Sequence, residues 1–444
     1  MTATCQAARV QRDHVFGRAT APPTAVRAER CTITTADGRE YLDGAGGAIA
    51  SSVGHGRPEI VAAMSAQAAA VEYVHATQFT TAALSGFADR VAALVPVDDA
   101  RVFPVSGGSE ANETALKLAR SYHLALGEPE RHVVIAREGA YHGNSRGALD
   151  ASGRAGLRAG YEPWLGQTVR VPLANPYRDE RSGVEHAAEI DRTIRRVGPE
   201  RVAAFVAEPI SGATLGAVAP PDDYWPAVAA VCREHGVLLI LDEVMTGFGR
   251  TGVWFAAEHW GVRPDIITAG KGASSGYWPL GLCIASGEIH EAVEAAGGFV
   301  HGFTWSHHPV GAAVGSAVID LIERDGLVGA AATLGELGVE RLRTSLSAHD
   351  QVGDVRGKGL LMAVELVSDR TSKTPFDRED RVAERVTAAA FDRGLTCYPC
   401  TSAVDGAVGD AVLLGPPLCV TDAELAEMVD RLVAAITDVV GPVG

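Results

Sequence analysis

The stretch Val237-Leu238-Leu239-Ile240-Leu241-Asp242 decides the fold class of this chain of 444 residues. Its apolar residues are continuous and do not alternate with polar ones, and the run ends at a carboxylate. A run of this kind is typical of a strand whose two faces are both buried, as in a parallel sheet covered by helices. Similar runs at 202–207 and 265–268 flank it, and residues 222–235 between them have a helical pattern. The centre of the chain is therefore predicted to be α/β, with a mostly parallel sheet.

Further strands of this sheet are expected at 102–105, 133–136 and 280–285. After Pro309 the pattern becomes that of a separate α+β unit, with its expected elements in the order helix 310–324, helix 327–348, hairpin 352–367, helix 380–393, strands 395–398 and 412–414, and helix 421–439. Near the N-terminus, strand-like residues 32–34 and 41–43 flank an Asp37-Gly38 turn, which indicates a hairpin. We expect an N-terminal segment (1–60) that packs with a small C-terminal domain (326–444), and a large domain (61–325) between them.

The composition excludes several classes of function. The chain carries 55 acidic and 39 basic residues, a formal net charge of -16, so binding to nucleic acid or to an anionic membrane is not expected. No apolar stretch reaches the roughly 18 residues of a spanning helix, and residues 1–18 lack the apolar region of a secretory signal. Seven scattered cysteines are typical of a reducing compartment, which predicts a cytoplasmic protein. The C-x-x-C at 397–400 lacks a second pair of ligands, so no metal is expected there.

The first segment with chemical potential is 106–113, Ser-Gly-Gly-Ser-Glu-Ala-Asn-Glu. It follows a strand-like run and opens a helix with apolar residues at helical spacing. Glycines before a helix N-terminus allow backbone N–H groups to approach a phosphate, whose charge the helix dipole favours. The alternative is a plain turn between a strand and a helix.

Asp242 and Lys271 each follow a predicted strand, and 29 residues separate them. The simple interpretation of Asp242 is a helix cap or a salt bridge, and the other is a partner for a cationic ligand nitrogen. Lys271 lies between Gly270 and Gly272, where it is either a surface lysine or a desolvated amine that acts as a nucleophile. The spacing of 29 residues is long enough for one strand–helix–strand unit, so both residues could line one pocket.

The sequence lacks two common nucleotide-binding motifs at these positions. A P-loop that used Gly270-Lys271 would require glycine at 265 and serine or threonine at 272, but the chain has Asp265 and Gly272. Gly107-Gly108 lacks the spacing of a G-x-G-x-x-G motif.

A phosphate cradle, an acidic partner for a ring nitrogen and a nucleophilic lysine together describe a site for pyridoxal phosphate, in which Asp242 would keep the pyridine nitrogen protonated.

With these residues in view, the sequence resembles the class III aminotransferases, which have the fold of aspartate aminotransferase. The resemblance covers roughly residues 41–420. It is carried by the joint order and spacing of short segments at 41–44, 54–56, 106–113, 141–143, 207–210, 241–244, 247–252, 270–272 and 301–304. It implies a pyridoxal-phosphate-dependent transferase of fold type I, with a large domain of seven-stranded type and a small α+β domain.

The resemblance also implies roles for the cofactor-binding residues. Gly108 and Ser109 would bind the cofactor phosphate, Tyr141 and Val244 would pack on the two faces of its ring, and Glu208 would lie near Asp242.

Lys271 would be the Schiff-base lysine, and Lys271 and Asp242 the catalytic residues. Thr304 would reach the phosphate bound by the neighbouring subunit, which implies a homodimer with shared active sites. The implied reaction moves an amino group between an amine or amino acid and a keto acid or aldehyde, in two half-reactions.

Three positions depart from the common pattern of the family. Met245 stands where many members have glutamine, and its thioether cannot donate a hydrogen bond to the ring hydroxyl. His307 stands where glycine is common, and we interpret it as a change in packing. Residues 394–430 contain no lysine or arginine, so an arginine of that segment cannot bind a substrate carboxylate. Substrates could instead be recognised as amines, or Asp405 could face a cationic group.

Two alternatives remain open from the sequence. A racemase, aminomutase or decarboxylase would share the fold and the cofactor, and the Met245 substitution and the missing arginine keep this alternative open. A non-catalytic descendant of such an enzyme is the other, and the presence of both Lys271 and Asp242 counts against it.

Overall fold

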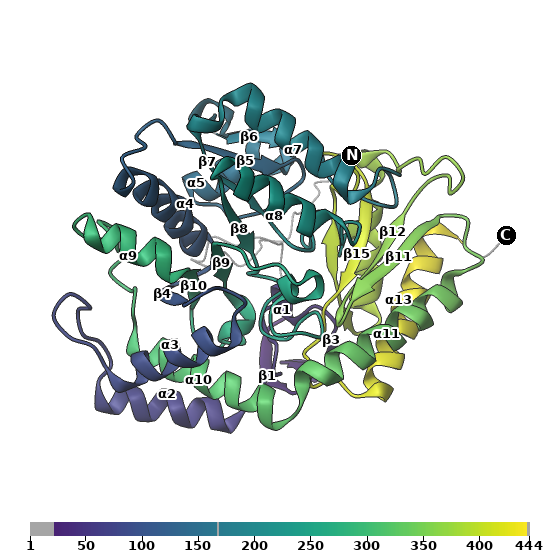
Figure 1. Ribbon diagram of the computed structural model, residues 1–444. Coiled ribbons are helices and arrows are strands. Elements are labelled where there is room, and N and C mark those ends of the chain that lie inside the picture. Colours follow the sequence, from purple (N-terminus) through teal and green to yellow (C-terminus); the bar gives the residue numbers. More distant parts are fainter. Residues whose placement is uncertain (1–21, 167, 442–444) are drawn as a thin grey trace, which may run out of the picture.

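The computed structural model of the chain describes residues 22–166 and 168–441. A seven-stranded sheet forms its centre, and two four-stranded sheets lie beside it (Figure 1). The strands of the large sheet are, in spatial order, β4 (Arg101–Val105), β10 (Gly281–Ala285), β9 (Ile266–Ala269), β8 (Leu238–Asp242), β7 (Val202–Ala207), β5 (Val133–Arg137) and β6 (Thr168–Val171). Only β10 runs antiparallel to its neighbours, so the prediction of a mostly parallel sheet is confirmed.

Strand β7 shows why its apolar run is continuous. Ala204 and Val206 belong to a buried cluster with residues of α4, while Phe205 and Ala207 belong to another with residues of α7 and α8. Successive side chains of a strand point to opposite faces, and here helices cover both faces. These helices are α4 (Gly108–Ala125), α7 (Gly183–Val197) and α8 (Tyr224–His235).

The C-terminal part forms its own α+β unit, drawn in yellow-green in Figure 1. Its antiparallel sheet has the order β11-β12-β15-β14, with helices packed against it. The elements are β11 (Val352–Lys358), β12 (Leu361–Leu366), β14 (Tyr398–Cys400), β15 (Asp410–Leu414), α11 (Leu327–Leu346), α12 (Val382–Asp392) and α13 (Asp422–Val440). The predicted hairpin and helices are thus present, with ends that differ by a few residues.

The N-terminal strands form a sheet with one strand from the C-terminal part of the chain. Strands β1 (Ala25–Glu29), β2 (Thr32–Thr35) and β3 (Glu40–Asp43) are antiparallel, and β3 pairs in parallel with β13 (Leu395–Thr396). The expected strand at 395–398 is therefore two strands in two sheets. Pro399 lies in the edge strand β14, where its missing N–H costs no ladder hydrogen bond. The boundaries of the three expected segments stay predictions.

Alanine-rich helices pack together along the lower edge of the view in Figure 1, where α10 contacts α2 and α3. The remaining helices, including short 3-10 turns named η, are α1 (Gly46–Ile49), α2 (Pro58–Ala70), α3 (Ala82–Leu94), α5 (Arg146–Ala151), α6 (Ala155–Arg158), α9 (Gly287–Ala295), α10 (Pro309–Arg324), η1 (Glu162–Trp164), η2 (Pro199–Arg201), η3 (Ala256–Trp260), η4 (Lys271–Ala273) and η5 (Arg378–Asp380).

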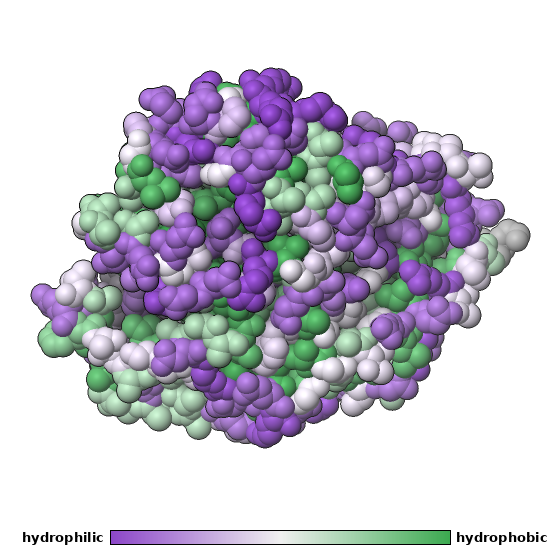
Figure 2. All heavy atoms as spheres, in the orientation of Figure 1, coloured by the Kyte–Doolittle hydropathy of each residue, from purple (hydrophilic) through white to green (hydrophobic). Residues whose placement is uncertain are grey.

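Hydrophilic and hydrophobic residues are interspersed on the face drawn in Figure 2. Among residues 22–166 and 168–441, no helix combines the length and the apolar character that crossing a membrane requires. The six cysteines of this part of the chain are free and buried, including Cys397 and Cys400. The expectation about a secretory signal falls on residues outside the described ones.

Candidate active site

A cavity opens where the carboxyl ends of β7, β8 and β9 meet the N-terminus of α4. Parallel strands bring their carboxyl ends to one edge of a sheet, so segments distant in the sequence converge there. Seven of the eight residues predicted to form the site line this cavity: Gly108, Ser109, Tyr141, Glu208, Asp242, Val244 and Lys271. Further lining comes from Asn112, His142, Gly143, Ile210, Ala213 and Met245.

The carboxylate of Asp242 is buried and held by three donors. Its Oδ2 accepts hydrogen bonds from His142 Nδ1 at 2.7 Å and from Asn112 Nδ2 at 2.8 Å. Its Oδ1 accepts from the backbone N–H of Val244 at 3.0 Å. Asn112 is fixed in turn by Thr268, whose hydroxyl donates to Asn112 Oδ1. This network fixes the direction in which Asp242 faces the cavity, because each donor occupies a defined lone pair.

Sequence reasoning did not assign roles to His142 and Asn112, although both lie in motifs that it singled out. Asn112 is four residues after Gly108 on α4, and residues four apart share a helix face. This spacing was a usable signal. His142 had none beyond its place between Tyr141 and Gly143. Its Nε2 is buried and has no hydrogen-bond partner in the described residues.

Glu208 is a second buried carboxylate beside Asp242. Burial raises its pKa and the negative charge of Asp242 adds to the rise, while His142 and Arg137 act in the opposite direction. Its Oε2 accepts from the backbone N–H of Tyr141 at 3.3 Å. Two adjacent buried carboxylates favour a cation between or beside them, and a protonated ring nitrogen would meet that requirement.

Lys271 begins η4, with one residue between it and the end of β9, and has a left-handed backbone (φ 42°). Burial lowers the pKa of its amine to about 8, although the negative charges of Asp242 and Glu208 oppose this shift. Arg250 lowers the pKa further. Within the described part of the chain, Lys271 Nζ has no hydrogen-bond or ion-pair partner. A desolvated, unpaired amine at the wall of a cavity is suited to nucleophilic attack on an aldehyde.

The N-terminus of α4 provides space for an anion. Gly108 is packed so closely that a Cβ there would lie 2.7 Å from Cγ1 of Val244. Gly143 has a φ of 134°, and a Cβ on it would lie 2.3 Å from Ser109 Oγ. Both positions therefore require glycine to keep Val244 and Ser109 at the cavity wall. The unpaired N–H groups of the first helical turn and the Ser109 hydroxyl can bind a phosphate.

These residues fit pyridoxal phosphate in three independent ways. Close-packed glycines at a helix N-terminus suit its phosphate, a buried carboxylate pair suits its protonated ring nitrogen, and an unpaired amine suits its aldehyde.

Thr304 is the predicted site residue that does not line the cavity. It is exposed, and its carbonyl accepts a hydrogen bond from the hydroxyl of Tyr73 at 2.9 Å. Its predicted role in a neighbouring subunit is not tested and stays a prediction. Nearby, His307 packs edge-on against Phe103, with ring centroids 4.5 Å apart, which agrees with a packing role.

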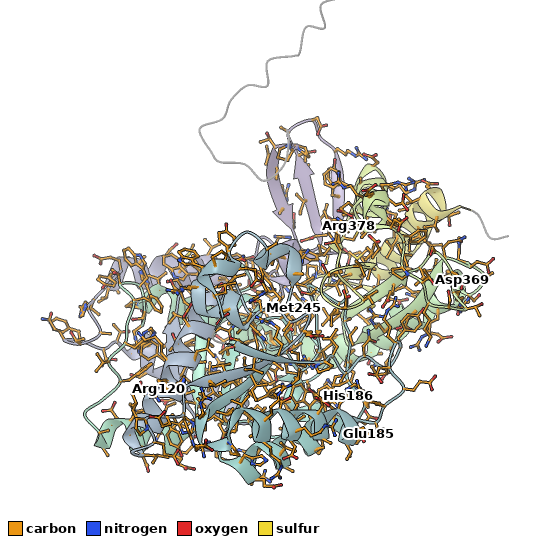
Figure 3. The ribbon with its side chains drawn as sticks, turned by 90° about the horizontal axis from the view of Figure 1, so that it is seen from above. Arg120, Glu185, His186, Met245, Asp369 and Arg378 are labelled. Carbon is orange, nitrogen blue, oxygen red and sulfur yellow. The ribbon has the colours of Figure 1, made fainter. Side chains whose placement is uncertain are left out.

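Met245 and Asp405, two further residues that the sequence analysis singled out, lie in different places. Met245 lines the cavity and lies near the middle of the molecule (Figure 3). Its sulfur is so close to Gly212 that a Cβ there would be 2.0 Å away. Asp405 is exposed, and its Oδ1 accepts from the backbone N–H groups of Ala407 and Val408. Asp405 therefore stabilises its own turn, and its predicted contact with a cationic group stays untested.

The chain matches the family model for class III aminotransferases over residues 17–436. It is 37% identical over 440 residues to an uncharacterized aminotransferase of Sinorhizobium fredii, covering 96% of this chain and 93% of the relative. It is 35% identical to the diaminobutyrate–2-oxoglutarate transaminase of Halomonas elongata, covering 92% of this chain and 88% of the relative.

Two solved structures are also close in fold. An (S)-enantioselective omega-transaminase from Thermomicrobium roseum matches with a TM-score of 0.89 at 39% identity, covering 94% of this chain and 93% of that one. The omega-transaminase from Pseudomonas jessenii in complex with PMP matches with a TM-score of 0.89 at 32% identity, covering 95% and 94%.

This fold and these relatives define a pyridoxal-phosphate-dependent transferase with an α/β large sheet. Within that class, the chain belongs to the class III aminotransferases. It is an enzyme that catalyses transamination with pyridoxal phosphate.

Proposed function

We propose that this aminotransferase uses Lys271 as its cofactor-bonding lysine and Asp242 as the partner of the cofactor ring nitrogen. The observation that carries the proposal is the convergence of both side chains on one cavity from the ends of β8 and β9. Gly108 and Ser109 would hold the phosphate, and Tyr141 and Val244 would enclose the ring.

The proposed division of labour follows from the contacts of each residue. Pyridoxal phosphate, when bound, supplies an electron-withdrawing ring that makes the proton on the amine-bearing substrate carbon removable. Lys271 Nζ would take that proton and return it to a different carbon, as a general base and then an acid. Asp242, held by His142 and Asn112, would keep a proton on the ring nitrogen. Glu208 would add negative charge beside it.

Amines or amino acids and keto acids are the substrates of this family. We further propose that the enzyme is a homodimer whose two copies share their active sites. Exposed apolar side chains beside Thr304 support it: Phe79 is 62%, Val300 91% and Trp305 57% exposed. Such residues on neighbouring segments are typical of a surface that a partner covers. Thr304 would then reach the phosphate held by the other copy. A cytoplasmic location also stays a prediction.

Borohydride reduction followed by peptide mass spectrometry tests the lysine directly. Reduction should fix the cofactor on the peptide that contains Lys271, and Lys271→Ala should abolish both this label and turnover. Lys117→Ala is the matched control, because Lys117 is exposed and bonds only to His301 among the described residues. A label on another lysine, or turnover by Lys271→Ala, would refute the assignment.

Titration with an amine donor separates the reaction types. In the proposed function the visible absorption of the bound cofactor is lost as the amino group is transferred, and a keto acid restores it. Persistence of the band with a turned-over donor would instead indicate a racemase, aminomutase or decarboxylase. Met245 is the reason for comparing these reaction types. It lines the cavity, and its thioether donates no hydrogen bond there.

A further inference from the structure

The C-terminal segment 394–430 carries no lysine or arginine, but a guanidinium from another segment lies against it. Arg154 precedes the short helix α6, and its Nη2 donates a hydrogen bond to Thr401 Oγ1 at 2.9 Å. The backbone N–H of Ala155 also donates to the carbonyl of Gly406 at 2.9 Å. The large domain therefore supplies a cation where the C-terminal segment has none of its own.

Arg154 is tied on one side to the wall of the active-site cavity. Two residues before it, the Ser152 hydroxyl accepts a hydrogen bond from the backbone N–H of His142, a cavity residue. The N–H of Gly153 donates to the carbonyl of Ala140, directly before Tyr141. The backbone leading to Arg154 thus runs alongside the segment that carries Tyr141 and His142.

Thr401 is connected to another part of the cavity lining, at Met245. It follows Cys400, whose Sγ contacts the carbonyl of Gly212 at 3.7 Å. Gly212 in turn lies against the sulfur of Met245, which lines the cavity. Arg154 and Thr401 do not line the cavity themselves, but each is connected to a segment that does.

The guanidinium of Arg154 has unused hydrogen-bonding capacity. It is half-buried, and no carboxylate lies within ion-pair distance of it in the part of the chain that the structure describes. Other arginines in this region are engaged: Arg137 donates to the Glu208 carbonyl and to Ser211, and Arg356 pairs with Asp354 and Glu365. A half-buried cation without a counter-ion is a ready partner for a carboxylate.

We propose that Arg154 binds the carboxylate of the keto-acid acceptor, and of amino donors that carry one. Thr401 Oγ1 accepts from Arg154, so its hydroxyl hydrogen is free to donate to the same carboxylate. Amine donors and aldehydes without a carboxylate would use the cavity without this contact. The inference rests on the proposed function, since it concerns the substrate of the same cavity.

Separate half-reactions of the holoenzyme test the proposal. For Arg154→Met, kcat/KM for pyruvate and 2-oxoglutarate should fall roughly 10- to 100-fold, the value of a hydrogen bond to a charged group. The value for butanal, an uncharged aldehyde, should change by no more than about twofold. Arg154→Lys should recover part of the loss, because lysine keeps the charge but not the two-pronged geometry.

A binding measurement gives a readout that does not depend on turnover. The calorimetric dissociation constant of glutarate, an unreactive dicarboxylate, should rise for Arg154→Met in parallel with the kinetic loss. Thr401→Val should raise it by a smaller factor, because only the second donor is lost. Arg146→Met is the matched control: its exposed guanidinium donates to the Trp164 carbonyl on the same segment, and neither readout should move.

Equal losses with butanal and with keto acids, or an unchanged glutarate constant in Arg154→Met, would overturn the assignment of Arg154. If Arg154→Met does not fold, Arg154→Lys and Thr401→Val give the same discrimination. Failure of the proposed function is a different result, in which borohydride labels another lysine or Lys271→Ala still turns over.

Discussion

At the scale of single residues, the proposed chemistry of the cavity depends on the protonation of Lys271. Burial lowers the pKa of its amine to about 8, and only the neutral amine attacks an aldehyde. The rate at which the apoenzyme captures pyridoxal phosphate should therefore rise with pH through about 8 and level off above it. Stopped-flow absorption across a pH series measures this midpoint. A rise that continues toward 10.5, the ordinary value for a lysine, would contradict the shift.

The neighbouring carboxylates supply the control for this pH profile. Glu208 and Asp242 both raise the pKa of Lys271, so removing either negative charge should move the midpoint to a lower pH. Glu208→Gln is the milder change, because Asp242 and its three donors stay in place. A midpoint that moves upward in Glu208→Gln would mean that another group titrates.

The sequence pointed to Asp242 and Lys271, but it did not point to residues that matter through their place in the fold. Asp242 and Lys271 follow apolar strands, and that place in an α/β fold carries functional meaning by itself. His142 and Asn112 became visible only when the fold brought them to Asp242. Arg154 was missed because its partner Thr401 is 247 residues away in the sequence.

At the scale of elements, periodicity predicted the strands and long helices, and its errors have local causes. The run at 395–398 looks like one strand because sequence alone does not show that β13 pairs with β3 and β14 with β15. The antiparallel direction of β10 was also out of reach, since a buried strand has the same apolar pattern in either direction.

The start of η3 shows how one buried side chain can hold an element. The Glu243 carboxylate is fully buried and accepts hydrogen bonds from the Thr246 hydroxyl and from the backbone N–H groups of Ala256 and Ala257. Glu243→Ala would leave two buried N–H groups without partners and should cost about 2–4 kcal/mol of unfolding free energy. Urea denaturation at a fixed cofactor concentration measures this cost.

Glu258→Ala is the matched control for Glu243→Ala. Glu258 also accepts from a backbone N–H of this turn, that of Phe255 at 2.7 Å, but its side chain is exposed. Water can replace it there, so the loss should stay below about 1 kcal/mol. Equal costs for the two variants would show that burial of the hydrogen bonds is not what makes Glu243 important.

At the scale of the whole molecule, the proposed homodimer would form through one exposed apolar surface. Tyr73 links two segments, since its ring lies 5.5 Å from that of Trp305 and its hydroxyl bonds the Thr304 carbonyl. Phe79 and Val300 extend this exposed apolar surface, which is formed by the segments 73–79 and 300–305. An aromatic surface of this kind at the position of Thr304 would place that residue at the partner's cavity, in an isologous interface.

Charge placed in this surface should separate the copies. The double variant Val300→Lys with Trp305→Glu should raise the dimer dissociation constant at least roughly 30-fold, the cost of one buried aromatic anchor. Sedimentation over a concentration series measures it, and cofactor retention should fall in parallel if Thr304 contributes to the partner's phosphate site. Val184→Glu is the control, because Val184 is 56% exposed on α7 and should leave the dimer unchanged. A double variant that stays dimeric would place the interface elsewhere. An unmodified protein that sediments as a monomer would mean that there is no such interface. In either case the cavity would have to bind the cofactor phosphate with Gly108 and Ser109 and without Thr304 of a second copy.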